Sequence, residues 1–331
     1  MTRILAADIG GTNSRFGHFE LVPGQEPTLL ESFSIPTGSV PSFAHLLGRL
    51  KDSGFGLDPM AADRIVLAVA GPVHDGVRCQ LTNASWNIDL CDPGIGLPLE
   101  RTVLVNDFVA QALGCQTRHA ARSAVTVQEG AARPGVVAAV GAGTGLGQCG
   151  LLPLPGGEAD FLLLPSEGGH APLAFVSEPE FRFLEFLKAQ TDHSHGFGDI
   201  VVSGSGLSSL HLFLTGRRLT PAEVAREIGP DSETTAWFAR FYGRACRAYA
   251  LHVLAWGGLN LCGGLAAKNP FLVTHGEFVR EFRDCPAYGA LLARIPIRLI
   301  TAPDIGLHGA ACHGRMLERR GHSNAVHTFV A

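Results

Sequence analysis

Lysine is almost missing from this sequence. Only Lys51, Lys188 and Lys268 occur among its 331 residues, and the other 23 of its 26 basic residues are arginines. With 30 acidic residues the formal net charge is −4 at pH 7. A chain without a basic surplus has no electrostatic attraction for the phosphates of nucleic acid or of an anionic membrane. We therefore expect neither nucleic acid nor membrane as a partner.

Paired cysteines, a signal peptide and a membrane-spanning run are missing too. Eight cysteines are scattered without a C-x-x-C pair, which favours free thiols over a zinc knuckle or a disulfide framework. The apolar start of the chain stops at Asp8, too early for a signal peptide. The most apolar long segment, residues 245–265, contains Arg247 and His252 and is interrupted by glycines. These absences together predict a cytoplasmic protein.

Strands and helices alternate along the chain. Its length predicts about two domains, and 46% hydrophobic with 17% charged residues is typical of a globular protein. Residues 64–70 and 103–105 form buried apolar runs, and the second leads into a predicted helix over 109–114. Such alternation predicts an α/β fold, with mixed or parallel sheets covered by helices.

Several helices can be placed from spacing and capping signals. Apolar residues at helical spacing predict a helix from Phe43 to Leu50, and a long helix spans about 233–256. Ser177 and Thr220 each stand three residues before a glutamate, the pattern of a capping box at a helix start. A last strand over 297–301 and a last helix over 306–319 complete the chain.

The N-terminal stretch organises the rest of the chain. An apolar run ends in Asp8, and the segment Ile9-Gly10-Gly11-Thr12-Asn13 separates it from a second alternating run. We interpret this as a strand, a tight turn and a returning strand. The glycines let the backbone approach a bulky group, and Asp8 is placed to hold Mg2+ through water. This suits a polyphosphate with its metal, although a plain β-hairpin explains the stretch equally well.

A second glycine turn follows a predicted strand over 136–140. Its residues are Gly141, Gly143, Thr144, Gly145 and Gly147, and backbone N–H groups in such a turn bind phosphate oxygens. The pattern overlaps the G-x-G-x-x-G of dinucleotide-binding proteins, but residues 148–152 resemble a returning strand where that fold needs a helix. No P-loop motif exists. Two similar turns indicate two similar sheets, with ligands bound between two lobes.

Two further stretches carry candidate substrate ligands. Asn106 and Asp107 lie between a strand and a helix, where Asp107 is either a general base or part of a helix N-cap. Glu167 and His170 flank two glycines, and such a turn can present both side chains to the vicinal hydroxyls of a sugar. No third residue at a usual spacing supports a metal site there.

Three weaker candidates remain. Gly263-Gly264, after a predicted strand over 259–262, would let a flat group such as adenine approach the backbone, or would serve only as a turn. His308 and Cys312 share a helical face, which we interpret as packing. His193 and His195 are expected in a polar loop.

Taken in order, these motifs resemble the bacterial ATP-dependent glucokinase family, which shares the fold of actin and hexokinase. The matching segments cover about residues 3–320 and run in family order: residues 8–15, 81–83 with Trp86, 105–108, 141–147, 165–170, 202–207, 262–264 and 305–309. The zinc-binding cysteine cluster of the other bacterial sugar-kinase group (repressor/ORF/kinase) is absent.

The resemblance implies a two-lobed actin-like ATPase (ribonuclease H-like) fold with a central cleft. A small lobe would span 1–115 and be completed by the C-terminal helix 306–320, and a large lobe would span 116–305. Asp107 would take the proton from the 6-hydroxyl of glucose, while Asn106, Glu167, His170 and Asp199 would hydrogen-bond other hydroxyls. The implied cofactors are ATP and Mg2+. Their ligands would be Asp8, Ile9, Gly10, Gly11, Thr12, Asn13, Gly141, Gly143, Thr144, Gly145, Gly263 and Gly264, with Asp8 holding Mg2+ through water.

The sequence departs from the family at two positions. Asp199 stands where the family usually has Glu, and Ser205 replaces a usual Pro. Weaker sugar binding is therefore expected, and a kinase of another hexose or an amino sugar is an alternative, as is a sugar-binding regulator without turnover. A dehydrogenase is disfavoured by the strand after Gly147. The family also suggests a homodimer.

Overall fold

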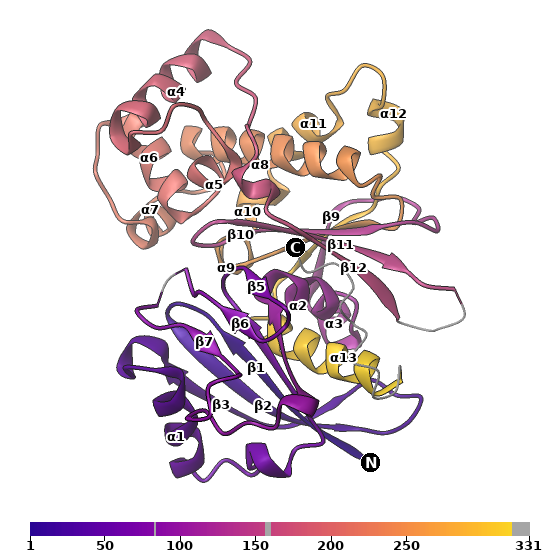
Figure 1. Cartoon of the computed structure of the whole chain (residues 1–331). Helices are drawn as coiled ribbons and strands as arrows, with labels where there is room; N and C mark the ends of the chain where they lie inside the picture. Colours follow the sequence, from indigo (N-terminus) through magenta and orange to yellow (C-terminus); the bar gives the residue numbers. More distant parts are fainter. Residues whose placement is uncertain (83, 156–159, 320–331) are drawn as a thin grey trace. The chain divides into compact units, whose positions relative to one another are not determined.

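The structure, a computed structural model, describes residues 1–82, 84–155 and 160–319 (Figure 1). The chain divides into two units: unit 1 comprises Met1–Arg122 and the chain from Asp304 onward, and unit 2 comprises Ser123–Pro303. The first boundary lies beyond the expected residue 115 because helix α3 (Arg118–Arg122) stays with unit 1, where His119 hydrogen-bonds Asp304 at 2.7 Å. The motif residue Asn83 lies outside the described residues.

Unit 1 is built on a five-stranded sheet in the order β3-β2-β1-β4-β8. β1 pairs antiparallel with β2 and parallel with β4, which is parallel to β8. A small antiparallel sheet, β5-β6-β7, is attached. The elements of unit 1 besides α3 are β1 (Thr2–Ile9), β2 (Asn13–Leu21), β3 (Thr28–Pro36), α1 (Phe43–Asp52), β4 (Arg64–Val69), β5 (Val73–His74), β6 (Arg78–Cys79), β7 (Ile88–Asp89), β8 (Thr102–Asn106), α2 (Asp107–Gly114) and α13 (Ile305–Arg319), with short 3-10 turns at Thr37–Ser39, Pro59–Ala61 and Leu99–Arg101.

Alternation along β1 gives the sheet of unit 1 two buried faces. Leu5 and Ile9 point into a cluster with Leu46 of α1, whereas Ile4 points into a separate cluster with Leu307 of α13. Successive side chains of a strand point to opposite faces. Side chains of β1 therefore pack against α1 on one face of the sheet and against α13 on the other. Figure 1 shows α13, the last helix of the described chain, lying along this sheet.

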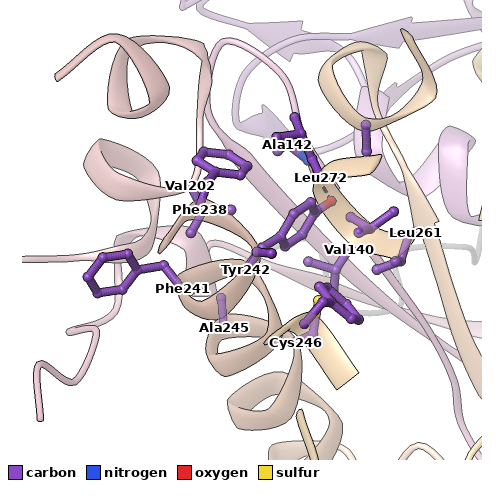
Figure 2. Close-up of a cluster of buried hydrophobic side chains, with 14 of the residues drawn as sticks. Val140, Ala142, Val202, Phe238, Phe241, Tyr242, Ala245, Cys246, Leu261 and Leu272 are labelled. Carbon is purple, nitrogen blue, oxygen red and sulfur yellow. Dashed lines mark hydrogen bonds between the residues drawn. The ribbon is translucent and has the colours of Figure 1, made fainter. Parts of the chain in front are cut away.

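Unit 2 is built on a six-stranded sheet in the order β12-β11-β10-β13-β14-β9. The long helix α8 packs on one face of it through Phe238 and Tyr242 (Figures 1 and 2). The elements are β9 (Ala124–Gln128), β10 (Val137–Ala142), β11 (Leu146–Pro153), β12 (Phe161–Ser166), the 3-10 turn η4 (Gly168–His170), α4 (Glu178–Thr191), α5 (Gly198–Val201), α6 (Gly204–Thr215), α7 (Pro221–Glu227), α8 (Glu233–His252), β13 (Gly258–Cys262), α9 (Gly264–Lys268), α10 (Phe271–Thr274), α11 (Gly276–Arg283), α12 (Gly289–Leu292) and β14 (Ile297–Ile300).

The two large sheets share one topology. In unit 2, β10 pairs antiparallel with β11 and parallel with β13, which is parallel to β14. The order β12-β11-β10-β13-β14 thus repeats β3-β2-β1-β4-β8 in both sequence and direction, and β9 is added at one edge. The predicted α/β fold with two mixed sheets and flanking helices is confirmed.

Two of the helix predictions need correction. α4 begins after Ser177 as expected, but the Ser177 side chain makes no capping bond, whereas the Thr220 capping box of α7 is present. Glu180 accepts a hydrogen bond from Val176 N at 2.8 Å and pairs with buried Arg244 at 2.7 Å, so its carboxylate is not available for a capping box. α8 ends at His252, four residues before the predicted 256, because Leu254 adopts a left-handed backbone with φ 47°.

The state of the cysteines and the length of the helices were both considered from the sequence. All eight cysteines are free thiols, and only Cys91 is exposed. Among the residues that the structure describes, no helix combines the length and apolar character needed to cross a membrane.

Candidate functional site

The first glycine turn joins β1 to β2 and is held by its own backbone and by Thr37. Gly10 N donates to Asn13 O at 3.0 Å, and Thr37 Oγ1 donates to Gly10 O at 2.7 Å. Ser14 Oγ lies 2.9 Å from Thr37 Oγ1 and therefore donates to it, since the Thr37 proton is already used. Both hydroxyls are buried. Thr37 was not predictable from the sequence, because a threonine just after another strand carries no local signal.

Asp8 lies at the end of β1, beside this turn. Burial raises the pKa of its carboxyl above the usual 3.8, and the Arg15 charge opposes this only in part. Arg15 is its partner residue across β1 and β2. At the start of α13 a side chain on Gly306 would place Cβ 2.7 Å from Asp8 Oδ2, so only glycine leaves room for the carboxylate. A half-buried carboxylate whose pKa is raised by desolvation is well suited to a cation.

Asn106 and Asp107 lie at the same edge of the sheet as Asp8. Ile9 is level with Val69, and Val69 with Asn106, in the parallel ladder β1-β4-β8. The carboxyl ends of parallel strands meet at one edge, where α/β proteins commonly bind ligands. Unit 1 therefore brings together the first turn, Asp8 and the Asn106–Asp107 pair.

Asn106 is the N-cap of α2. Its Oδ1 accepts from Phe108 N at 2.9 Å and from Val109 N at 3.3 Å, and its Nδ2 donates to Gly71 O at 3.3 Å. The helix N-cap that was the alternative for this pair is thus formed by Asn106. Among the described residues its Nδ2 donates one hydrogen bond, which leaves its second hydrogen for a ligand. Asp107 is the first residue of the helix.

The thiol of Cys79 interacts with the charge of Asp107. The pKa of Cys79 is raised to about 11, first by burial and then by the negative charge of Asp107. Cys79 is therefore a neutral thiol at physiological pH, and it is not a nucleophile.

The second glycine turn joins β10 to β11 and is held from three sides. Gly143 N donates to Gly145 O at 2.7 Å, and Gly204 N at the start of α6 donates to Gly143 O at 2.9 Å. The backbone N of Ala142 donates to the hydroxyl of Tyr242 at 3.1 Å, drawn as a dashed line in Figure 2. Tyr242 is fully buried, and burial raises the pKa of its phenol. This role of Tyr242 was not predictable from the sequence, because Tyr242 is one of many apolar residues on α8.

β11 begins at Leu146, immediately after the second turn, and runs antiparallel to β10. The predicted returning strand is confirmed, and the helix that a dinucleotide-binding fingerprint requires is not present. This removes the structural basis of the dehydrogenase alternative.

Gly263 and Gly264 follow β13, next to the second turn. Gly141 is level with Cys262 in the β10-β13 ladder. Gly263 has φ 88°, and a Cβ on it would lie 2.6 Å from Ala142 O, so both the backbone conformation and the space require glycine. A Cβ on Gly264 would meet nothing within 4 Å, which leaves that position open.

The segments η4 and α5, which carry the predicted sugar ligands of unit 2, both pack against Leu146. Glu167 and His170 are exposed at the two ends of η4. Asp199, in α5, accepts a hydrogen bond from Leu146 N at 2.6 Å through Oδ1. A carboxylate that was predicted as a sugar ligand therefore accepts a hydrogen bond from the backbone beside the second turn.

The candidate ligands are divided between the units. Unit 1 carries Asp8, the first turn, Asn106 and Asp107, and unit 2 carries the second turn, Glu167, His170, Asp199 and Gly263-Gly264. His193 and His195 are exposed, as predicted for a polar loop, and lie beside Phe197.

One other group of side chains resembles a metal site by residue type. Among the described residues, His119, Asp304 and His308 have ligand atoms within 4.8 Å of one another. The two imidazoles stack 4.0 Å apart and nearly parallel, so their in-plane lone pairs do not converge on one ion. Burial, followed by the neighbouring His119, lowers the pKa of His308 below its usual 6.5. This geometry agrees with the prediction that His308 serves packing.

Comparison with known proteins gives a consistent result. A family profile described as Glucokinase matches residues 5–316. A glucokinase of Chromohalobacter salexigens is 34% identical over 324 residues, which cover 94% of this chain and 97% of that protein. The crystal structure of a glucokinase from an Antarctic psychrotroph superposes with a TM-score of 0.78 at 26% identity, covering 95% of this chain and 99% of the other.

A more distant structure shares the fold. A glucokinase of the repressor/ORF/kinase family from Streptomyces griseus, solved with glucose and AMPPNP, has a TM-score of 0.61 at 19% identity and covers 95% of this chain and 100% of its own. The profile match and the 34% identity both extend over nearly the whole chain, and the fold and motif order agree with them. The chain therefore belongs to the glucokinase family.

Proposed function

We propose that this protein is a glucokinase that transfers the γ-phosphoryl group of MgATP to the 6-hydroxyl of glucose. The observation that carries the proposal is the position of Asp107. It follows β8 at the edge of the unit 1 sheet that also carries Asp8 and the first glycine turn. A proton acceptor and a phosphate-binding turn therefore share one edge, as transfer to a hydroxyl requires.

Asp107 would act as the general base. Its carboxylate would accept the proton of the 6-hydroxyl as that oxygen attacks the γ-phosphorus, and ADP would leave on the opposite side. Asn106 would position the sugar with its remaining Nδ2 hydrogen, while its Oδ1 stays committed to the helix.

Unit 2 would supply the other sugar contacts. Glu167 and His170 are exposed at the ends of η4 and therefore accessible to ring hydroxyls. Asp199 has Oδ1 committed to Leu146 N, so a sugar hydroxyl would bind at Oδ2.

The two glycine turns would bind the phosphates of ATP, and Gly263-Gly264 would lie against the adenosine. The open surface at Gly264 supports that assignment. Asp8 fits a Mg2+ ion, bound through water, because the Arg15 charge offsets only part of the cost of desolvating its carboxylate. The ion would neutralise charge on the phosphates; the protein's own part is to fix the two turns through Thr37 and Tyr242.

The decisive experiment measures sugar-dependent ADP release with MgATP over a panel of glucose, mannose, fructose and glucosamine. The proposal expects the highest kcat/KM for glucose and phosphorylation at the 6-hydroxyl, verified by coupling to glucose-6-phosphate dehydrogenase. A higher kcat/KM for another sugar would assign the site to that sugar, an outcome that the Asp199 departure makes worth testing. Sugar binding without ADP release would indicate a regulator.

A further inference from the structure

Leu146 is the point at which the second glycine turn meets the predicted sugar ligands of unit 2. It is 4% exposed, and its backbone N donates to Asp199 Oδ1 at 2.6 Å. Its carbonyl oxygen lies so close to Gly169 that a Cβ there would approach it to 2.0 Å. Its side chain lies against Gly198, where a Cβ would come within 2.7 Å of Leu146 Cδ2.

At the glycines around Leu146 there is no room for a side chain between the second turn, η4 and α5. A Cβ on Gly145 would lie 2.2 Å from Asp199 Oδ1, and a Cβ on Gly198 would lie 2.9 Å from Gly169 O. Because no Cβ would fit at these glycines, the turn, η4 and α5 pack closely against one another, with the backbone of Gly169 against Leu146 O and that of Gly198 against Gly169 O. A displacement of any one of the three therefore moves the others, because close-packed segments do not deform independently.

We propose that Asp199 is a positioning residue for the second glycine turn, and that through it the affinities for sugar and nucleotide are coupled. Oδ1 fixes Leu146 N, and with it the last residues of the turn. Oδ2 faces the sugar hydroxyl in the proposed function, on which the sugar half of this inference rests. A sugar bound at Oδ2 restricts the motion of the Asp199 carboxylate. Because Oδ1 of the same carboxylate binds Leu146 N, the turn becomes more ordered as well. The coupling is reciprocal, so nucleotide must raise sugar affinity by the same factor.

The first test uses MgADP alone, without sugar or turnover. Calorimetry on Asp199→Ala should show a dissociation constant raised about tenfold or more, since a hydrogen bond to a charged group is lost. Asp199→Asn keeps a carbonyl oxygen at the same position and should remain within about threefold of the parent protein. Asp231→Ala, which removes an exposed carboxylate of the same unit, should change nothing. Equal affinity of Asp199→Ala and the parent, or equal weakness of Asp199→Asn and Asp199→Ala, would overturn the proposal.

A double-mutant cycle tests the contact itself. Gly145→Ala should weaken MgADP binding because its methyl group displaces Asp199 Oδ1. In the double variant Gly145→Ala/Asp199→Ala that clash is absent, so the combined loss should be much smaller than the product of the two single losses. Independent, multiplicative losses would show that the two residues act separately and would overturn the proposal. Melting temperatures and circular dichroism identify any variant that fails to fold, and Asp199→Asn then carries the comparison.

The sugar half is tested by measuring the dissociation constant of glucose with and without saturating MgADP. The parent protein should bind glucose several-fold more tightly with MgADP present, and Asp199→Ala should lose that difference. An undiminished difference in Asp199→Ala would overturn the coupling. If glucose does not bind at all while MgADP affinity responds to Asp199 as described, the proposed function fails but the positioning role stands.

Discussion

At the scale of single residues, Asp107 carries the chemistry of the proposed reaction. Asp107→Asn keeps the size of the side chain and its place at the first position of α2 but removes the proton acceptor. A positioned general base contributes roughly 10²- to 10⁴-fold to the rate. We expect kcat to fall by about that factor with glucose affinity nearly unchanged, measured by steady-state kinetics and by calorimetry with glucose. A normal kcat in this variant would contradict the role of Asp107 as general base and leave it only a structural role at the start of α2.

Asp8 should show a conflict between stability and activity. Because its folded-state pKa is raised, the folded protein binds more protons than the unfolded chain between pH 3.8 and the folded pKa, so stability falls as pH rises through that window. Asp8→Asn removes this cost. We expect the metal-free variant to melt at a higher temperature than the parent at pH 7, by a margin that grows from pH 4 upward and then levels off.

The same Asp8→Asn variant should be nearly inactive, since it lacks the carboxylate proposed to hold Mg2+. Melting curves in the presence of a chelator, together with kcat at saturating Mg2+, measure both effects. A variant less stable than the parent at neutral pH would show that Asp8 is well satisfied without an ion.

The residue types of the site were predictable, but their contacts with one another were not. Local sequence was enough to place Asp8, Asp107 and the two glycine turns at strand ends. Asn106 proved to be a helix cap as well, and Asp199 bonds to a turn 53 residues away. Thr37 and Tyr242, which hold the turns, depend on long-range pairing that no local pattern encodes. Sequence spacing is enough to find functional residues at the ends of strands. The residues that hold the glycine turns in place come from distant segments and are determined by tertiary packing.

At the scale of elements, the crossing of α2 and α13 depends on two glycines. A Cβ on Gly309 would lie 1.7 Å from Ala110 O, and one on Gly114 would lie 2.0 Å from Ile305 O. Gly309→Ala should therefore destabilise the protein by about 1–3 kcal/mol or more through overpacking. Urea unfolding measures the change in the free energy of unfolding.

Gly48 provides the matched control. It lies in α1, is exposed, and a Cβ on it would meet nothing within 4 Å. The same Gly→Ala change should there stabilise the protein by about 0.5–1 kcal/mol, because alanine is the better helix former. If Gly309→Ala were also neutral or stabilising, the two helices would not be in backbone contact.

Element boundaries show where sequence signals compete. The Thr220 capping box forms because the Glu223 carboxylate accepts hydrogen bonds from Thr220 N and Thr220 Oγ1. The similar pattern at Ser177 did not form, since buried Arg244 draws Glu180 into hydrogen bonds of 2.7 and 3.1 Å. A buried guanidinium without partners would cost far more than a missing cap. The buried Arg244 thus needs Glu180 as its counter-charge, and this tertiary contact prevents the capping box that the local sequence at Ser177 favours.

At the scale of the whole molecule, the proposed sugar ligands come from both units. If one glucose is bound by Asn106 and Asp107 as well as by Glu167, His170 and Asp199, the protein should become more compact when glucose binds. Small-angle scattering should then show a smaller radius of gyration with saturating glucose than without it. A Glu167→Ala/His170→Ala variant, which should not bind glucose, serves as the control. An unchanged radius with binding verified by calorimetry would contradict a closing motion.

The duplicated topology was only partly visible in the sequence. Two strand–turn–strand units near 4–21 and 136–152 predicted two similar sheets, and both contain the same five-strand order. The extra edge strand β9 and the small sheet β5-β7 were not anticipated, because short strands without clear alternation resemble loops.

The path of the chain also determines when each unit can fold during synthesis. Unit 2 is continuous, from Ser123 to Pro303, and can fold as soon as it leaves the ribosome. Unit 1 is made first but lacks α13, whose Leu307 and Ala310 cover one face of its sheet against Ile4 and Ala6. At translation rates of about 5–20 residues per second, the 197 residues from Arg122 to Arg319 delay that cover by roughly 10–40 s. The nascent N-terminal part of unit 1 therefore exposes an apolar sheet face to chaperones until α13 emerges. Unit 2 is synthesised later but is the first unit that can be completed.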